Sequence, residues 1–247
     1  MSSENWILIT GASGGIGVQL VDHLLQRGWR NLLCHYRTHP GPITELLEKY
    51  GIDAAERLLQ ADLTCEDQVT RLREATERVA GPPFGLVNLA GGSTNRLSWK
   101  MSRDEFHQVI DQNLLTTFLT CREFTPSMRQ HGRGRMINIS SVVAYTGAAG
   151  AAHYCAAKAA IIGFSRGLSL ELAPKGIAVS VIALGYFQYG LIHTIREEQQ
   201  DQLKARIPAA RFGSAPELGG LVCYLLSDAG AYSGGQVYHL NGGIYSG

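Results

Sequence analysis

The 247-residue sequence lacks the cysteine patterns and the long apolar runs that mark several protein classes. Five cysteines are scattered along the chain without any CxxC spacing: Cys34, Cys65, Cys121, Cys155 and Cys223. An odd, dispersed set argues against a secreted disulfide framework or a structural zinc site and favours a reducing, cytoplasmic setting. No apolar run approaches the roughly 18 residues of a membrane span, and the opening MSSENWILIT has no basic segment before a long apolar stretch. We therefore expect a soluble, unprocessed chain with no membrane partner.

A strong excess of either charge is also absent. The sequence holds 22 Lys and Arg against 21 Asp and Glu, a formal charge of +1, and it has no long basic run. Bulk electrostatics therefore gives no reason to expect DNA, RNA or an anionic membrane as the main partner. The eight histidines form no HExxH motif or clustered ligand set, so a metal-dependent hydrolase is poorly supported. A small neutral or modestly charged substrate fits this composition.

Enough apolar material is present for one large domain. Hydrophobic residues make up 45% of the chain, and folding at this length removes roughly 70–75% of the unfolded chain's surface from water. No internal repeat, low-complexity tract or Pro/Gly/Ser-rich linker divides the sequence. We predict a single domain over residues 1–247.

Short β-rich runs alternate with longer segments of helical periodicity. Seven runs are typical of strands: residues 6–10, 31–36, 57–61, 85–89, 135–140, 177–183 and 236–240. Because parallel neighbours need a connection of a dozen or more residues, this spacing predicts a seven-stranded, mostly parallel sheet covered by helices on both faces. The expected fold is a doubly wound (Rossmann-type) α/β domain.

Two helix starts are marked by S-x-x-E capping boxes, Ser102 with Glu105 and Ser214 with Glu217. The stretch 185–212 breaks the regular alternation, since it mixes aromatic residues with a charged, helix-like segment. We interpret this stretch as a mobile cover over a substrate site. An ordinary surface helix is the alternative.

The first strand runs into a glycine-rich turn that leads into a helix, with the sequence TGASGGIG at residues 10–17. Glycine lets the backbone turn sharply and approach a pyrophosphate, and the free N–H groups and positive dipole at a helix start favour an anion there. The flanking strand and helix favour dinucleotide binding over a turn that is glycine-rich for packing alone. The predicted contacts are Gly11, Ser13, Gly15, Ile16 and Gly17.

The residues after the second strand bear on the choice between NAD and NADP. An acidic residue there would accept the ribose hydroxyls and repel a 2′-phosphate, but the sequence has His35, Tyr36 and Arg37. Arg37 could pair with the phosphate, so NADPH is favoured over NADH. A solvated surface arginine is the alternative interpretation of Arg37.

Tyr154 and Lys158 are four residues apart, so in a helix they lie on one face within reach of each other. A phenol has an ordinary pKa near 10 and is a poor proton shuttle at neutral pH unless a nearby cation favours the phenolate. We expect Lys158, together with an oxidised nicotinamide, to lower the pKa of Tyr154. By itself the Tyr-x-x-x-Lys spacing is also common by chance.

These motifs resemble those of the short-chain dehydrogenase/reductase family along essentially the whole chain. The glycine turn resembles the family's T-G-x-x-x-G-I-G cofactor loop, although it has no basic residue at Gly14, where many NADP-preferring members carry one. Asp62 and Leu63 resemble the family's adenine-contacting position. The family's N-N-A-G segment is matched except at its second Asn, where this chain has Leu89. The cofactor contacts implied by that segment are Asn88, Ala90 and Gly91.

The resemblance also implies a catalytic set. Ser141, 13 residues before Tyr154, matches the family's catalytic serine, and Asn113 in the predicted helix 103–120 matches its fourth catalytic position. The implied roles are polarisation of the substrate carbonyl by Ser141 and Tyr154, proton donation by Tyr154, and a relay through Lys158, the cofactor ribose and a water held by Asn113. Asn113 also has a structural interpretation, as a core amide that satisfies a bent helix backbone. Ser140 is expected to be a structural counterpart on the opposite side of the strand.

Three stretches look like those of β-ketoacyl carrier-protein reductases: 134–143, 207–213 and 240–245. This resemblance implies NADPH-dependent reduction of a 3-ketoacyl thioester, presented by an acyl carrier protein or CoA, in fatty-acid or polyketide-like synthesis by a homotetramer. Leu184 departs from the family's Pro-Gly, and Leu170 stands where fatty-acid reductases often carry a carrier-docking arginine. Alternative basic contacts are Arg129, Arg133 and Arg166.

Two alternatives stay open. A dehydrogenase of a sugar, polyol or steroid-like alcohol would use the same centre, and the motifs do not separate it from a ketoacyl reductase. A non-catalytic cofactor-binding partner in a complex is the second alternative, against which the intact catalytic set speaks.

Overall fold

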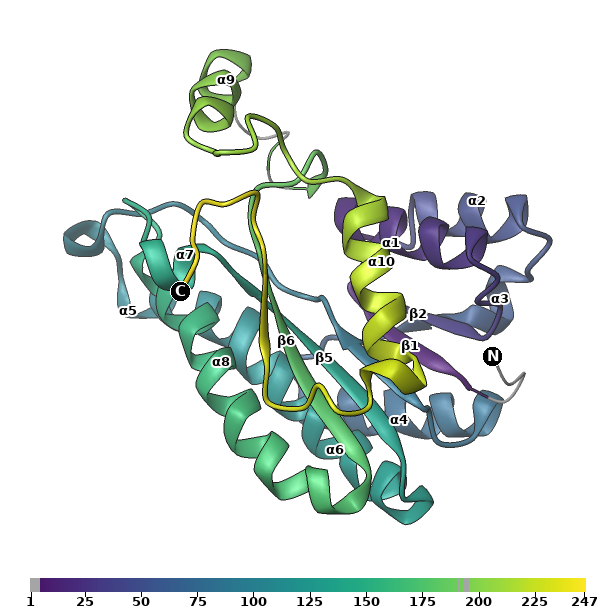
Figure 1. Ribbon diagram of the computed structural model, residues 1–247. Coiled ribbons are helices and arrows are strands. Elements are labelled where there is room, and N and C mark those ends of the chain that lie inside the picture. Colours follow the sequence, from purple (N-terminus) through teal and green to yellow (C-terminus); the bar gives the residue numbers. More distant parts are fainter. Residues whose placement is uncertain (1–4, 191, 193–195) are drawn as a thin grey trace.

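A computed structural model describes residues 5–190, 192 and 196–247 of the protein. Within these residues, seven strands form one sheet through the centre of the molecule (Figure 1). The strands are β1 (Ile7–Thr10), β2 (Leu32–Tyr36), β3 (Leu58–Gln60), β4 (Gly85–Asn88), β5 (Gly134–Ser141), β6 (Ile177–Leu184) and β7 (Val237–Leu240). Their order is β3-β2-β1-β4-β5-β6-β7, and every neighbouring pair is parallel. The seven predicted strands and the doubly wound α/β fold are confirmed, with a sheet that is wholly rather than mostly parallel.

Long helices cover both faces of the sheet. One face carries α1 (Gly15–Gln26), α2 (Pro42–Lys49) and α10 (Ala215–Leu226), and the other carries α4 (Glu66–Ala80), α6 (Thr116–His131) and α8 (Ala152–Leu172). Shorter connecting helices are α3 (Ala54–Arg57), α5 (Arg103–Ile110), α7 (Val143–Thr146), η1 (Ser98–Lys100), η3 (Ala173–Lys175) and η5 (Asp228–Gly230). The strand order reverses between β1 and β4, and in such sheets ligands bind beyond the carboxyl ends of the strands at that reversal.

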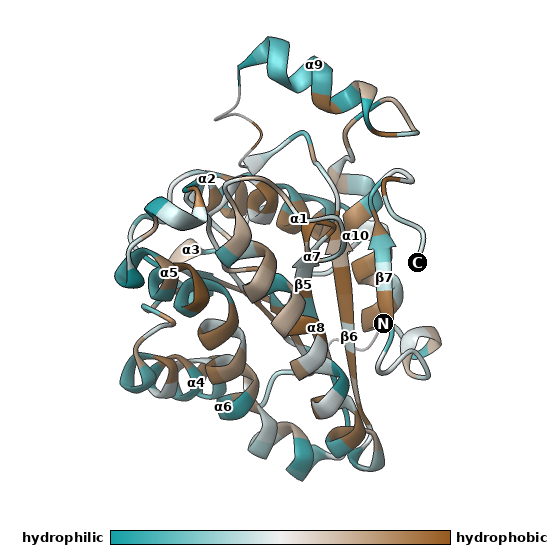
Figure 2. Cartoon of the chain, turned by 90° about the vertical axis from the view of Figure 1, so that its left-hand side faces the viewer, coloured by the Kyte–Doolittle hydropathy of each residue, from teal (hydrophilic) through white to brown (hydrophobic). Residues whose placement is uncertain are grey.

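The strands supply side chains alternately to two cores. In β1, Ile7 and Ile9 pack with Leu20 of α1, while Leu8 packs with Phe124 of α6, and all of these side chains are fully buried. The hydropathy view shows apolar strands such as β6 between helices whose outward sides are hydrophilic (Figure 2). This burial on both faces fixes the ends of the strands, and therefore the positions of the residues that follow them.

The predicted helix 103–120 is interrupted in the structure. α5 begins at the Ser102–Glu105 capping box, which has both reciprocal hydrogen bonds, and a π-helical turn, η2 (Asp111–Leu115), separates α5 from α6. Within that turn, Asn113 Nδ2 donates a hydrogen bond to Val109 O at 2.8 Å, so a side chain takes a carbonyl that a regular helix would use. This agrees with the structural interpretation of Asn113.

The stretch 185–212 leaves the body of the domain. Its helix α9 (Glu197–Ala205) is largely hydrophilic, has no buried residue, and stands away from the sheet in both views (Figures 1 and 2). The stretch has its own small cluster of Ile192, Ile207 and Phe212. Residues 191 and 193–195 of the predicted cover, like residues 1–4, lie outside the described residues, and the cover stays a prediction. No helix in the described part of the chain is long and apolar enough to cross a membrane.

Candidate active site

The candidate residues converge at the carboxyl edge of the sheet. The glycine turn follows β1, Asn88 ends β4 and Ser141 ends β5. Tyr154 and Lys158 come from the first turns of α8, which packs against β5 and β6. Because parallel strands all end at the same edge, the fold brings together residues that are far apart in the sequence.

The backbone of the glycine turn requires glycine at two positions. Gly11 has a φ of +67°, which favours glycine, and a Cβ there would lie 2.8 Å from Ala90 Cα. A Cβ on Gly17 would overlap the backbone of Gly11, so only glycine lets α1 start directly on the turn. Among the described residues, no side chain caps α1 at Gly14, which leaves the first N–H groups of the helix for an anion.

Two more of the predicted cofactor contacts line a hollow beside this turn. Ser13 and Gly15 line it together with Pro42, Tyr189 and Gly190. A Cβ on Gly15 would lie 2.7 Å from Gly190 N, so the segment after β6 touches the cofactor turn. Ile16, half-buried at the start of α1, packs against the same Gly190.

Two polar side chains that the sequence analysis did not assign hold the turn in place. His35 Nδ1 accepts a hydrogen bond from Gly11 N–H at 3.1 Å, and its Nε2–H donates to Ala61 O at 2.9 Å. Burial lowers the pKa of His35 to about 4, so the ring is neutral at physiological pH. The Thr10 hydroxyl accepts from Ala90 N–H at 3.1 Å. The available signal in the sequence was a polar residue inside an otherwise apolar strand.

The residues predicted for the adenosine end follow β2 and β3. Arg37 is exposed directly after β2. The pKa of Asp62 is lowered mainly by the hydrogen bond from Thr64 N–H, and the charge of Arg37 adds to this effect. Leu63 is buried in the core beneath α4 and α6, so its side chain is used for packing. Arg37 and Asp62 therefore lie close together beside the glycine turn.

The residues at the end of β4 and just after it have two roles: Asn88 is structural, whereas Ala90 and Gly91 face the candidate site. Asn88 Nδ2 donates to Asn138 Oδ1 at 2.9 Å, and Asn88 Oδ1 accepts from the Thr120 hydroxyl at 2.8 Å. This buried network joins β4, β5 and α6, so the side chain of Asn88 is directed into the sheet layer. Ala90 and Gly91, by contrast, lie against the glycine turn and the catalytic candidates.

Ser141 and Tyr154 meet where β5 ends and α8 begins. Their side chains are hydrogen-bonded to each other, and Ser141 Oγ accepts from Val143 N–H at 3.4 Å. Ser140 points to the other side of the strand, where its hydroxyl donates to Lys158 O at 2.8 Å. The structural role predicted for Ser140 is confirmed.

Lys158 and Asn113 face one small space beneath Tyr154. Lys158 Nζ is buried 5.6 Å from the centroid of the Tyr154 ring and donates to Ile139 O at 2.9 Å. Asn113 is fully buried, and its Oδ1 has no hydrogen-bond partner among the described residues. A Cβ on Gly91 would lie 2.5 Å from Asn113 Oδ1 and 3.4 Å from Lys158 Nζ. Glycine at 91 therefore keeps the space between amide and ammonium open.

Burial shifts the pKa values of both Tyr154 and Lys158 in the chain without cofactor. Burial raises the pKa of Tyr154 to about 12, and the hydrogen bond with Ser141 offsets this only in part. Burial also lowers the pKa of Lys158 to about 8. In the chain without cofactor the Lys158 ammonium lies over the ring and donates to Ile139 O rather than to the phenol oxygen, so it does not offset the effect of burial. The lowered pKa of Tyr154, which was expected with an oxidised nicotinamide bound, stays a prediction. The second cation in that expectation, the oxidised nicotinamide, belongs to the cofactor.

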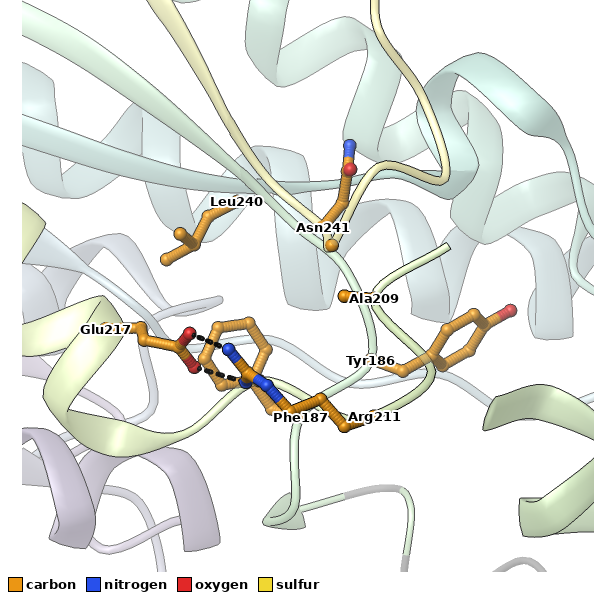
Figure 3. Close-up of a pocket in the computed structure, with 9 residues that line it drawn as sticks. Tyr186, Phe187, Ala209, Arg211, Glu217, Leu240 and Asn241 are labelled. Carbon is orange, nitrogen blue, oxygen red and sulfur yellow. Dashed lines mark hydrogen bonds and ion pairs between the residues drawn. The ribbon is translucent and has the colours of Figure 1, made fainter. Parts of the chain in front are cut away.

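A further pocket extends the site past the ends of β6 and β7 (Figure 3). On one side Arg211 donates two hydrogen bonds to Glu217, at 2.7 and 3.1 Å, and Tyr186 points away from this pair. Glu217 also accepts from Ser214 N–H at 2.8 Å, as the second predicted capping box requires. The ion pair closes one wall of the pocket, so the polar groups of that wall are already satisfied.

The end of β6 gives a physical reason for Leu184 at the position where the family has the proline of Pro-Gly. Leu184 continues β6 by one residue, paired with Ser141 of β5 and Leu240 of β7. A Cβ on Gly185 would lie 2.6 Å from Asn241 Cα, so the chain leaves the sheet tightly packed on the end of β7. A proline could not donate to the ladder, and leucine therefore suits a strand that reaches the level of Ser141.

A family model described as short chain dehydrogenase matches residues 5–200 of this sequence. The chain belongs to the short-chain dehydrogenase/reductase family. Nodulation protein G of Rhizobium sp. is 36% identical over 239 residues, covering 96% of this chain and 95% of the relative. The 3-oxoacyl-[acyl-carrier-protein] reductase FabG of Staphylococcus aureus is 34% identical over 241 residues (96% and 97%). The acetoacetyl-CoA reductase of Acinetobacter sp. is 34% identical over 246 residues (99% of both).

As a member of the short-chain dehydrogenase/reductase family, the protein is an NAD(P)-dependent oxidoreductase. The residues present fit such a cofactor. The glycine turn offers a cradle that side chains would fill, and the buried, unpartnered Asn113 Oδ1 faces the space beside Lys158. Gly11, Ser13, Gly15, Ile16 and Gly17 would hold the pyrophosphate, and Arg37 and Asp62 lie toward the adenosine end.

Proposed function

We propose that this oxidoreductase uses NADPH to reduce a 3-ketoacyl thioester to the 3-hydroxyacyl form. The observation that carries the proposal is the meeting of Ser141, Tyr154, Lys158 and Asn113 at the sheet edge that also bears the glycine turn. The names of the relatives support the substrate class, since they include a 3-oxoacyl-carrier-protein reductase and an acetoacetyl-CoA reductase. Exposed Arg37, with no carboxylate at the neighbouring positions of β2, supports NADPH over NADH.

When bound, NADPH supplies the hydride that the ketone carbon receives. Ser141 Oγ and Tyr154 Oη donate hydrogen bonds to the carbonyl oxygen, and Tyr154 gives its proton to that oxygen as the alcohol forms. In the chain without cofactor, burial raises the pKa of Tyr154 to about 12, so the phenol is protonated at neutral pH and has a proton to give. Lys158, with a pKa of about 8, releases and regains a proton far more readily than an ordinary lysine. Asn113 Oδ1, which has no hydrogen-bond partner among the described residues, would accept a hydrogen bond from a water in that relay.

We further propose a cytoplasmic homotetramer whose substrate is carried by an acyl carrier protein or by CoA. Leu170 is 81% exposed on α8, an unusual position for a leucine, which supports contact with another copy or a partner. Arg166, one turn earlier, is exposed on the same helix. Arg129 and Arg133 lie beside the start of β5, at the edge of the sheet opposite Ser141 in the same chain.

The test follows NADPH oxidation with a panel of 3-ketoacyl-CoA and 3-ketoacyl-carrier-protein thioesters, quinones and sugars, and NADP reduction with polyols and steroid alcohols. We expect kcat/KM to be highest for a thioester. Tyr154→Phe protein purified in parallel controls for contaminating reductases. Activity with sugars or steroid alcohols alone would overturn the thioester assignment and leave the family intact. Cofactor binding without turnover of any compound would favour a non-catalytic partner.

A further inference from the structure

We propose that His35 is a positioning residue for the dinucleotide, which acts by fixing the first glycine of the turn through its Nδ1 atom. This inference rests on the cofactor site of the proposed function. Neither the family match nor the motifs of the sequence assign a role to this histidine.

The bonds of the ring define a bridge between segments. Nδ1 accepts from Gly11 N–H at 3.1 Å, and Nε2–H donates to Ala61 O at 2.9 Å. Since Gly11 N–H can only donate, Nδ1 must carry the lone pair and Nε2 the proton. The backbone oxygen of His35 separately accepts from Ala12 N–H at 2.9 Å, a contact that any residue at this position would keep. The Gly11 and Ala61 contacts alone depend on the side chain.

The bridged segments are those that would hold the adenosine half of the cofactor. Gly11 opens the pyrophosphate turn, His35 itself lies two residues before Arg37, and Ala61 immediately precedes Asp62. One imidazole therefore sets the spacing between the ends of β1, β2 and β3. Gly11 has a left-handed conformation and lies against Ala90, so its N–H is fixed by the ring from one side and its Cα by the segment after β4 from the other.

The environment of the ring keeps it in the required form. His35 is 2% exposed, so its nitrogens have little access to solvent. Burial lowers the pKa of His35 to about 4, although the nearby Asp62 carboxylate acts in the opposite direction. The neutral ring keeps its acceptor for Gly11 throughout the physiological pH range.

Two amide variants, each of which reproduces one of the two ring nitrogens, separate the two bonds. In His35→Asn, the amide oxygen occupies the level of Nδ1 and can accept from Gly11 N–H, while the Ala61 contact is lost. In His35→Gln, the amide nitrogen occupies the level of Nε2 and can donate to Ala61 O, while Gly11 N–H loses its acceptor. An unsatisfied buried donor costs about 1–3 kcal/mol, which corresponds to roughly 5- to 150-fold in an equilibrium constant. His39→Gln, an exposed histidine in the loop that follows, is the matched control.

The measurements are the Kd of NADPH by fluorescence titration, the Kd of reduced nicotinamide mononucleotide, which lacks the adenosine half, and Tm. We expect His35→Gln to weaken NADPH binding about tenfold or more and to leave mononucleotide binding within about threefold. His35→Asn should retain most of the NADPH affinity, as should the control. In steady state, His35→Gln should raise the KM for NADPH with little change in kcat. A purely structural role predicts equal losses in both variants, for both nucleotides.

Other outcomes are also decisive. If His35→Gln binds NADPH as tightly as the wild type, the proposal for His35 is overturned while the proposed function stands. If the wild type binds dinucleotide but reduces no thioester, the proposed function is overturned while the proposal for His35 stands. If no wild-type binding occurs, both fail. Should the variants not fold, nitrogen-15 NMR of the wild-type ring decides: a proton on Nδ1 would overturn the proposal, and the Nε2–H form with a Gly11 amide shift on NADPH binding would support it.

Discussion

The two halves of the carboxyl edge of the sheet differ in how fully their polar groups are hydrogen-bonded. In the half formed by β1, β2 and β3, His35, Thr10 and Asp62 are each hydrogen-bonded within the chain. In the half formed by β4, β5 and α8, Asn113 Oδ1 has no partner among the described residues, and burial shifts the pKa values of both Tyr154 and Lys158 away from ordinary values.

This difference separates a binding frame from a reactive centre. In the binding frame, formed after β1, β2 and β3, the polar side chains already have hydrogen-bond partners within the chain. A nucleotide therefore binds to groups that are already ordered, which lowers the free-energy cost of binding. An unsatisfied buried polar atom such as Asn113 Oδ1 is costly in the folded protein and marks a group whose partner is supplied by the reaction. The shifted pKa of His35, by contrast, belongs to a ring whose two nitrogens are both hydrogen-bonded. The same edge of the sheet therefore carries a hydrogen-bonded binding frame after β1, β2 and β3, and a reactive centre with an unpartnered polar atom after β4 and β5.

The largest expected effect is on turnover, from a change in the reactive half. Tyr154→Phe removes the donated proton while it keeps the ring over Lys158, so kcat should fall at least ~100-fold, the scale of general acid catalysis, with the Kd of NADPH unchanged. Steady-state kinetics and nucleotide titration measure the two quantities. Tyr232→Phe, at a fully exposed tyrosine, is the control. Near-normal turnover would remove Tyr154 from the reaction and with it the contrast between the halves.

A smaller effect is expected from a change in the frame. Arg37→Asp should shift the ratio of kcat/KM for NADPH over that for NADH toward NADH by about tenfold or more, because a charge-assisted hydrogen bond contributes about 1.5–3 kcal/mol and the carboxylate would repel a 2′-phosphate. The maximal rate at saturating cofactor should change little. Arg71→Asp, at an exposed arginine of α4, should leave the ratio unaltered. An unchanged ratio in the Arg37 variant would take this residue out of the site.

The smallest expected effect is on stability. The pKa of Lys158 falls from 10.5 to about 8 on folding, a cost for the charged form of about 3 kcal/mol at roughly 1.4 kcal/mol per pH unit. Because the folded-state pKa is the lower one, this cost is present in full below pH 8 and disappears as pH rises toward 10.5. Lys158→Met also loses the hydrogen bond to Ile139 O, so we expect a net gain of about 1–2 kcal/mol at pH 7, or roughly 2–8 °C in Tm.

Thermal unfolding across pH distinguishes this explanation from better packing by methionine. The gain from Lys158→Met should shrink between pH 8 and pH 10, and catalysis should be lost at every pH. Lys175→Met, at an exposed lysine, should shift Tm by little throughout. A gain that is independent of pH would contradict the cost assigned to the buried ammonium.

Several features were predictable because they depend on local chemistry. The seven strands follow from apolar runs at crossover spacing, and the Ser102–Glu105 capping box follows from a four-residue pattern. Other features depend on neighbours that the sequence does not reveal. The π-helical turn at Asn113 reflects competition between a side chain and the backbone for Val109 O. The high pKa of Tyr154 reflects its burial in the folded chain.

Sequence periodicity and the glycine spacing by themselves determined the parallel α/β fold and the edge at which a nucleotide would bind, because alternation and turn geometry are properties of short segments. Only the tertiary structure decided that His35 supports the glycine turn, that Asn88 belongs to a buried network, and that the Lys158 ammonium binds Ile139 O. The physical reason is that hydrogen-bond partners and desolvation are fixed by packing between strands and helices that are distant in the chain.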